Sequence, residues 1–132
     1  MSSSDELAVR EALDGFYSAL NAIFVGNLAP MEALWSHADD VTYMGPFGDY
    51  RLGWADVRES WLEQQAMKLS GDVEPAEIKL NVGSELAIVH NLEVGHVFPD
   101  GHDEPVHLRA TNMFRKENDL WKMIGHHADR LP

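Results

Sequence analysis

The sequence predicts an α+β fold in which three N-terminal helices cap a curved antiparallel sheet. Two observations support this prediction. Apolar residues recur at helical spacing in the first half of the chain, and long segments of alternating apolar and polar residues fill the second half. Helices segregated from antiparallel strands in this way pack on one face of the sheet. The length of 132 residues matches one domain, so residues 1–132 are expected to form a single unit.

Three helices are expected before residue 70. The first begins at Ser3 and ends at Gly26. One of its faces carries apolar side chains three or four positions apart, namely Val9, Leu13, Phe16, Leu20 and Ile23. Pro30 favours the first turn of a short second helix, which ends near Trp35. A third helix is expected over about residues 54–69, before a Ser-Gly pair.

The remaining segments are typical of strands. A short strand is expected at residues 41–44, followed by turn residues at 45–49. Alternation of apolar and polar side chains then predicts four further strands, near residues 78–82, 86–98, 106–116 and 120–128. Long strands usually curve, and we expect the curved sheet and its helices to enclose a cone-shaped cavity.

The composition excludes several classes of function. The chain has 22 acidic and 10 basic side chains and a formal net charge of -12. This balance argues against nucleic-acid binding, which needs clustered Lys and Arg, and against docking on anionic membranes. The chain has no Cys, which excludes thiol catalysis, disulfides and Cys-based zinc sites. No apolar run is long enough for a membrane span and no signal peptide is apparent, so a cytoplasmic location is expected.

Three segments carry recognisable motifs. Residues 34–48 read LWSHADDVTYMGPFG, residues 53–57 read GWADV, and residues 109–127 read RATNMFRKENDLWKMIGHH. Together they resemble the ketosteroid-isomerase-like branch of the nuclear transport factor 2-like (NTF2-like) superfamily, to which the SnoaL-like polyketide cyclase-like proteins also belong. The chain departs from that pattern twice. Asp119 stands where the family turn usually has Gly, and Gly125 interrupts what is often a run of three His.

The resemblance implies a conical α+β barrel of the NTF2-like, or cystatin-like, type. It also implies a homodimer formed through the outer face of the sheet. It does not imply one activity, because the superfamily includes isomerases, cyclases, hydrolases, dehydratases and members without any chemistry. Function must therefore be argued from the residues of the site.

The last hairpin contains the best candidate catalytic residues. A three-residue turn at 117–119 would pair Arg109 with His127 across the hairpin. Because opposed residues share a face and Trp121 must be buried, Arg109, Thr111 and His127 are expected on the inner face of the sheet. His127 would then transfer protons and Arg109 would stabilise an anion. The alternative is structural, with Arg109 neutralised by an internal carboxylate and His127 a hydrogen-bonded core residue.

Tyrosine side chains complete the catalytic hypothesis. Tyr43 is the third predicted catalytic residue, as a hydrogen-bond donor, and Tyr17 is the alternative donor. No Asp or Glu falls at a clearly matching inner strand position, which argues against a steroid isomerase of the usual carboxylate-plus-tyrosine kind.

A further set of residues is predicted to line a ligand pocket. Most are aromatic side chains on the helices and the first strand, and two lie on later strands: Tyr17, Trp35, Phe47, Trp54, Trp61, His90 and Thr111. Such a set fits an apolar small-molecule site with few polar groups. The alternative is that most of the aromatic residues are plain core.

Two functional hypotheses follow. In the first, the protein binds a small apolar molecule and catalyses cofactor-free acid–base chemistry as an isomerase, cyclase or hydrolase. In the second, it is a non-catalytic ligand-binding or dimerisation module of the same fold. No metal site is expected, because the seven His show no ligand spacing on one element. A homodimer is expected through an outer face carrying Ala110, Asn112, Phe114, Ile124 and His126.

Overall fold

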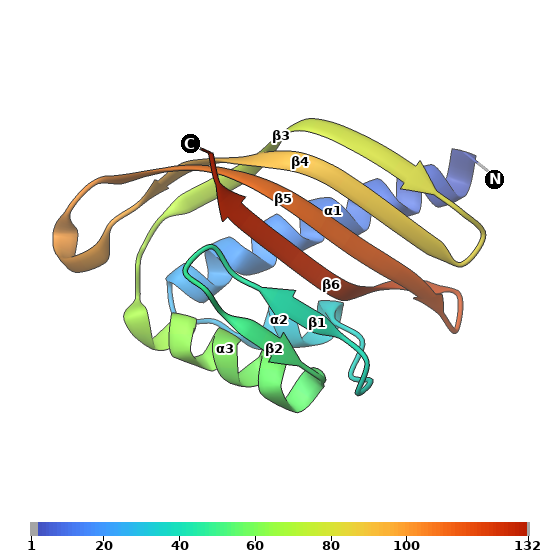
Figure 1. Ribbon diagram of the computed structural model, residues 1–132, viewed down its shortest axis with the longest axis horizontal. Helices are drawn as coiled ribbons and strands as arrows, with labels where there is room; N and C mark the ends of the chain where they lie inside the picture. Colours follow the sequence, from blue (N-terminus) through green and yellow to red (C-terminus); the bar gives the residue numbers. More distant parts are fainter. Residues whose placement is uncertain (1–2, 132) are drawn as a thin grey trace.

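The computed structural model describes residues 3–131. Its elements follow the order α1 (Ser3–Phe24), α2 (Ala29–Leu34), β1 (Thr42–Met44), β2 (Tyr50–Leu52), α3 (Trp54–Met67), β3 (Asp72–Val82), β4 (Leu86–Val97), the 3-10 helix η1 (Pro99–Gly101), β5 (Glu104–Glu117) and β6 (Leu120–Arg130). Figure 1 shows the helices behind one face of a curved sheet. The predicted α+β class is therefore confirmed.

The six strands form one open sheet in the order β2-β1-β6-β5-β4-β3. Neighbouring strands run antiparallel, except that β1 pairs with β6 in parallel. The sheet is therefore mixed rather than purely antiparallel, and it curves without closing into a barrel. The long strands β3 to β6 wrap around α1, and α3 lies beside the short pair β1 and β2 (Figure 1).

The apolar stripe of α1 forms the centre of the core. The predicted face of this helix is buried throughout, from Val9 to Ile23, with each stripe residue at most 8% exposed. The helix ends before Gly26, whose φ of 89° is a left-handed conformation that favours glycine. No helix within residues 3–131 combines the length and apolar character needed to cross a membrane.

The β5–β6 hairpin differs from the predicted register. Asn118 and Asp119 both have positive φ, at 50° and 62°, which makes a two-residue turn with Glu117 opposite Leu120. A β-bulge follows, because Phe114 pairs with Met123 while its neighbour Met113 pairs with Gly125. Ile124 is thus an extra residue in β6.

The two-residue turn and this bulge together reverse the predicted faces of the hairpin. The turn places Lys116, rather than Arg115, opposite the buried Trp121, so all of β5 faces the other way. Side chains alternate along a strand, so one extra residue turns the rest of β6 over. Trp121 is buried as expected, but His127 beyond the bulge lies with its partner Thr111 on the outer face. The predicted inner position of Arg109, Thr111 and His127 is therefore wrong.

The residues expected on the outer face are affected in the same way. Ala110, Asn112, Phe114 and His126 point inward and are at most 5% exposed. These four side chains belong to the interior and cannot form the predicted dimer surface.

Burial on the inner face of the sheet decreases toward one end. On the inner face of β5, Phe114 and Asn112 are fully buried, whereas Leu108 and Val106 farther along are only half-buried. On the neighbouring strand β4, Gly95 has a φ of 150°, and an added Cβ there would collide with the carbonyl oxygen of Asp72. We call this half-buried end of the inner face, which lies toward η1, the open end.

Candidate functional site

A cluster of polar side chains lies inside the fold, on the inner face of the sheet. It contains one residue from α1, two from β4 and one each from β5 and β6: Tyr17, Asn91, Glu93, Asn112 and His126. Each is at most 5% exposed. The strand residues reach the interior because they alternate in phase with buried apolar neighbours such as Val89 and Phe114.

The hydroxyl of Tyr17 is the centre of this cluster. It donates a hydrogen bond of 2.7 Å to Oε2 of Glu93 and accepts bonds from the side-chain amides of Asn91, at 2.8 Å, and Asn112, at 3.3 Å. The amide of Asn112 also donates to Oδ1 of Asn91 at 2.9 Å. The phenol therefore uses all its hydrogen-bonding capacity within the cluster.

His126 continues the network from β6. Its Nδ1 lies 2.6 Å from Oδ1 of Asn112. Since that oxygen can only accept, Nδ1 carries the hydrogen and Nε2 is left with its lone pair. Nε2 lies 3.5 Å from Oε2 of Glu93. Donation thus runs in one direction, from His126 through the two amides and Tyr17 to the Glu93 carboxyl.

Burial changes the acidity of three groups in the cluster. It raises the pKa of Glu93 to about 7, although the hydrogen bond from Tyr17 acts in the opposite direction. It lowers the pKa of His126 to about 3 and raises the pKa of Tyr17 above its usual range. His126 is therefore a neutral imidazole and its approach to Glu93 is not an ion pair. Near neutral pH, Glu93 is the member of this cluster that exchanges a proton.

Aromatic rings cover the cluster on the helical side. The rings of Phe16 and Tyr43 lie 4.7 Å and 5.8 Å from that of His126, and the ring of Trp61 lies 4.8 Å from that of Tyr43. The hydroxyl of Tyr43 accepts a hydrogen bond of 3.1 Å from Gln64 on α3. Of the predicted site residues, Tyr17, Tyr43 and Trp61 thus lie in or against this interior cluster.

Glu93 lies at the boundary between the closed interior and the open end. Its cross-strand partner on β5 is Leu108, which is half-buried, and the next inner pair along the strands is Gly95 with Val106, also half-buried. Asn91, two residues earlier, pairs with the buried Ala110. Within the cluster, Glu93 is therefore the carboxyl that a molecule at the open end of the fold would meet.

The other predicted aromatic residues lie elsewhere. Trp35 is buried beneath α2, where its Nε1 contacts the sulfur of Met31 at 3.3 Å. Trp54 is half-buried and stacks on His37 with 4.4 Å between ring centres. Phe47 is 82% exposed in the β1–β2 loop, beside Arg130. Within residues 3–131, none of these three side chains has a ring contact or a hydrogen bond to the polar cluster.

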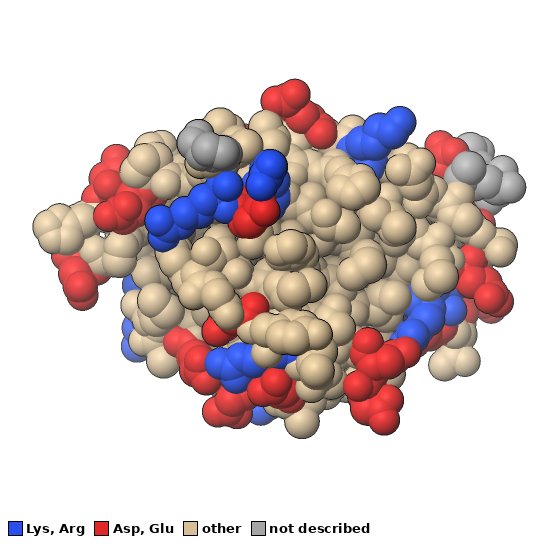
Figure 2. Space-filling view, viewed as in Figure 1, with Lys and Arg blue, Asp and Glu red and all other residues tan. Residues whose placement is uncertain are grey.

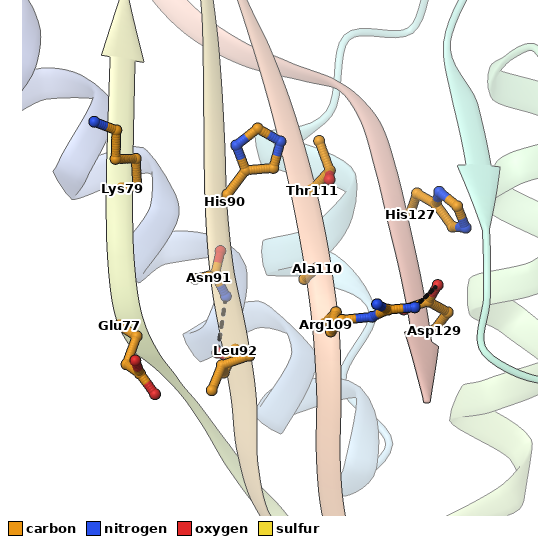
Figure 3. Close-up of a pocket in the computed structure, with 10 residues that line it drawn as sticks. All are labelled: Glu77, Lys79, His90, Asn91, Leu92, Arg109, Ala110, Thr111, His127 and Asp129. Carbon is orange, nitrogen blue, oxygen red and sulfur yellow. Dashed lines mark hydrogen bonds and ion pairs between the residues drawn. The ribbon is translucent and has the colours of Figure 1, made fainter. Parts of the chain in front are cut away.

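The remaining predicted residues do come together, but on the outer face. His90, Thr111 and His127 are paired in register across β4, β5 and β6, beside Lys79 on β3 (Figure 3). They line a shallow depression of about 490 Å³.

Arg109 lines the same depression. It makes two hydrogen bonds of 2.9 Å to Asp129, which hold the pKa of that carboxyl below its usual range. It therefore pairs with a carboxylate, as the structural alternative expects, although this carboxylate is on the surface rather than inside.

Sequence reasoning missed Glu93, Asn91, Asn112 and His126 as site residues. The signal for the first two was present, because Asn91 and Glu93 share the alternation phase of Ala87 and Val89 in an otherwise apolar strand. Asn112 was assigned to the opposite face because a three-residue turn was expected at 117–119, and His126 because no sequence feature marks the bulge at Ile124. Among residues 3–131, no three His, Asp or Glu side chains are grouped as a metal site would need.

Comparisons with known proteins identify the fold. The family model of the SnoaL-like domain matches residues 9–129. A candidate dehydratase of the NTF2-like family from Streptomyces avermitilis superimposes with a TM-score of 0.87 at 23% identity, over 99% of both chains. A candidate calcium/calmodulin-dependent protein kinase type II association domain from Thiobacillus denitrificans has a TM-score of 0.80 at 27% identity, over 93% of this chain and 94% of the other.

An NTF2-like superfamily protein from Salmonella enterica gives a TM-score of 0.81 at 15% identity, over 96% of this chain and 93% of that one. No protein among the curated sequences matches. The family model covers most of the residues that build the helices, the sheet and the polar cluster. The chain therefore belongs to the SnoaL-like domain family, and its fold is the one seen in NTF2-like proteins.

Proposed function

We propose that the protein binds a small uncharged molecule at the open end of the fold and transfers a proton to and from it through Glu93. The observation that carries this proposal is a buried carboxyl with a pKa of about 7, held by Tyr17 and paired across the strands with the half-buried Leu108. A general base works best when its pKa lies near the working pH. The carboxyl of Glu93 meets that condition without a cofactor.

The surroundings of Glu93 suggest how the proton moves. Tyr17 holds Oε2, so the proposal assigns the transfer to Oε1. The ionised carboxylate removes a proton from a carbon next to a carbonyl group. Return of the same proton at another carbon gives isomerisation, and its delivery to a leaving hydroxyl gives dehydration. The dehydratase-type description of the Streptomyces avermitilis neighbour supports chemistry of this class.

The charge of the interior favours an uncharged ligand. No Lys or Arg is found among the buried side chains of residues 4–131, and the buried charged or polar groups include one carboxyl, Glu93. Arg109, the predicted anion stabiliser, lies on the other face of the sheet. A carboxylate or phosphate ligand would therefore be placed near Glu93 without a counter-charge, which is unfavourable in a buried site.

Proton exchange on a simple ketone tests the proposal. 2-Tetralone is uncharged, apolar and has acidic C–H groups beside its carbonyl. We expect the protein to bind it and to accelerate deuterium incorporation from D₂O, followed by NMR, with a rate that rises as Glu93 ionises near pH 7. Glu93→Gln should bind the ketone but lose the acceleration, whereas the exposed-site control Glu63→Gln should behave as wild type.

Two results would contradict the proposal in different ways. If the ketone binds but Glu93 does not accelerate its deuterium exchange, the non-catalytic ligand-binding hypothesis is favoured. Absence of binding would mean that the open end is not a small-molecule site.

A second candidate function is self-association through the outer face of the sheet. Figure 2 shows a tan area free of Lys, Arg, Asp and Glu on this face, with charged side chains on several sides of it. The Arg109–Asp129 ion pair lies on the same face. Strand β4, next to the edge strand β3, contributes Ile88, which is 42% exposed, in phase with His90 and Leu92. A partly apolar face with a charged rim resembles a protein interface. The association-domain description of the Thiobacillus denitrificans neighbour supports this candidate.

A further inference from the structure

The contact between Glu93 and His126 brings two hydrogen-bond acceptors together in the interior. Oε2 of Glu93 lies 3.5 Å from Nε2 of His126, and the two side chains are 4% and 5% exposed. Nδ1 of His126 carries the hydrogen that is donated to Asn112, so Nε2 presents a lone pair to Glu93. An ionised carboxyl also presents lone pairs, and two facing acceptors without a donor are unfavourable in a buried site. A hydrogen on one of the two atoms removes this conflict.

This hydrogen has two candidate positions. On Nε2 it would make an imidazolium, because Nδ1 already carries a hydrogen, and burial opposes that charge by lowering the pKa of His126 to about 3. On Oε2 it leaves both groups uncharged, and burial favours this form by raising the pKa of Glu93 to about 7. The hydrogen therefore belongs on the carboxyl oxygen.

Tyr17 cannot be the acceptor of this hydrogen. Its hydroxyl donates to Oε2 of Glu93 at 2.7 Å, and its oxygen already accepts the amides of Asn91 and Asn112, at 2.8 Å and 3.3 Å. Among the described residues, Nε2 of His126 receives no hydrogen bond from any other group. The Nε2 lone pair is thus the acceptor that lies unused beside Oε2.

We infer that His126 is a positioning residue for Glu93: when Glu93 is protonated, its hydrogen lies on Oε2 and is donated to Nε2 of His126. This bond closes a ring of donors and acceptors. His126 donates to Asn112, and Asn112 to Asn91. Asn91 donates to Tyr17, and Tyr17 to Glu93. Hydrogen bonds linked in this way polarise and strengthen one another.

The inference rests on the proposed function, in which Glu93 carries the proton, and it names the group that controls that proton. A hydrogen bond donated by the neutral carboxyl favours the neutral form, so His126 adds to the effect of burial on the pKa of Glu93. Release of the hydrogen from Oε2 to solvent then makes Glu93 a base. Asn112 acts one step earlier, because its oxygen fixes the imidazole with the lone pair of Nε2 toward Glu93.

The other titratable side chains around this pair do not supply a competing proton. Tyr17 on α1 and Tyr43 on β1 face the pair, and burial raises the pKa of both hydroxyls above the usual range. His127 points to the outer face, and its charge acts to lower the pKa of His126 further. The groups facing the pair from β4 and β5 are amides, which do not titrate.

¹⁵N NMR of the histidine side chains tests the inference without a ligand. The His126 signals, assigned by their loss in His126→Gln, show which ring nitrogen carries the hydrogen and whether the other accepts a hydrogen bond. We expect the hydrogen on Nδ1 in the folded protein below and above pH 7. The Nε2 signal should leave its hydrogen-bonded position as Glu93 ionises near that pH.

Glu93→Gln is the matched variant. Its amide N–H can replace the carboxyl O–H as the donor to Nε2, so the Nε2 signal should keep its hydrogen-bonded position at every pH. Glu63→Gln, at an exposed position, should titrate as wild type does. A wild-type His126 with its hydrogen on Nε2, or an Nε2 signal that stays constant while Glu93 ionises, would overturn the inference.

Asn112→Leu tests the role of the tautomer. Without the acceptor for Nδ1–H, the hydrogen should move to Nε2 and be donated to the Glu93 carboxylate. This favours the ionised form, so the pKa of Glu93 should fall by about one unit. An unchanged tautomer and pKa would show that Asn112 does not position the imidazole. If this variant does not fold, the comparison of wild type with Glu93→Gln decides the inference.

The NMR result and the ketone exchange can fail separately. If the Nε2 signal follows Glu93 but the protein does not exchange 2-tetralone, the shared hydrogen is correct and the proposed function is wrong. If exchange depends on Glu93 while the Nε2 signal stays constant, the proposed function is supported and His126 does not position the proton.

Discussion

The hydroxyl of Tyr17 lies 2.7 Å from Oε2 of Glu93 and joins α1 to β4 across 76 positions of the chain. The same hydroxyl accepts hydrogen bonds from the side-chain amides of Asn91 and Asn112. One phenol thus satisfies three buried groups from two strands and fixes the helix above the sheet. Within residues 3–131, it also donates the only side-chain hydrogen bond that lowers the pKa of Glu93.

Removal of this hydroxyl should destabilise the protein and change the acidity of Glu93. We expect Tyr17→Phe to lower the free energy of unfolding by about 2 kcal/mol, because three buried groups each lose a partner. The pKa of Glu93 should rise above its value of about 7, since the bond from Tyr17 lowers it. Urea denaturation and carboxyl NMR give the two values. Tyr50→Phe, at a position 66% exposed, is the control; equal stability of the two variants would contradict the role of Tyr17.

The acidity of Glu93 predicts how stability depends on pH. Between the ordinary glutamate pKa of 4.5, which applies to the unfolded chain, and the folded pKa of about 7, the native state holds a proton that the unfolded chain has released. The Glu93 contribution to the free energy of unfolding therefore falls as pH rises through this window, by about 3 kcal/mol.

Comparison with Glu93→Gln isolates this effect. His126 acts with the opposite sign, because its pKa is lowered from 6.5 to about 3 and stability gained from it grows with pH between these values. That contribution is common to both proteins and cancels in the difference. Denaturation at pH values from 4.5 to 8 should show the stability of wild type declining relative to Glu93→Gln. Parallel curves would mean that Glu93 titrates normally.

The outer-face residues should not be needed for folding. Arg109 and Asp129 are about half exposed, and exposed ion pairs contribute little. We expect Arg109→Leu and His127→Leu to melt close to the wild-type temperature and to retain the exchange that depends on Glu93. Trp121→Ala, which empties a site only 8% exposed, should lose about 3–5 kcal/mol. If Arg109→Leu and His127→Leu melt as low as Trp121→Ala, Arg109 and His127 have a structural role. If these two variants lose the deuterium exchange, catalysis lies on the outer face.

Self-association predicts a mass of twice the 14.8 kDa chain. Ile88→Glu places a charge on the outer face of β4, and burying an unpaired charge in an interface is unfavourable. Sedimentation at micromolar concentration should therefore show a dimer for wild type and a single chain for Ile88→Glu. Leu7→Glu, on α1 and 62% exposed, should remain dimeric. A wild-type protein that sediments as one chain would exclude this interface.

Several features could be predicted from local sequence patterns. The buried stripe of α1 from Val9 to Ile23 follows from its spacing, and the alternation of β4 is visible in the sequence. The motif at residues 109–127 indicated the family, and family membership is confirmed over residues 9–129. The predicted single domain, cytoplasmic location and absence of cofactor and metal stay predictions.

Only the tertiary structure decided which face of the last hairpin is the interior. The sequence by itself determined the order of the elements, because periodicity and turn residues act locally. The face of β5 depends on the two-residue turn at Asn118 and Asp119. The face of β6 beyond Met123 depends on the bulge at Ile124, which forms as β6 pairs with β5 and allows both Met123 and His126 to be buried. One extra residue reverses every side chain beyond it. For this reason His127 lies outside, whereas His126 joins Tyr17 and Glu93 in the candidate site.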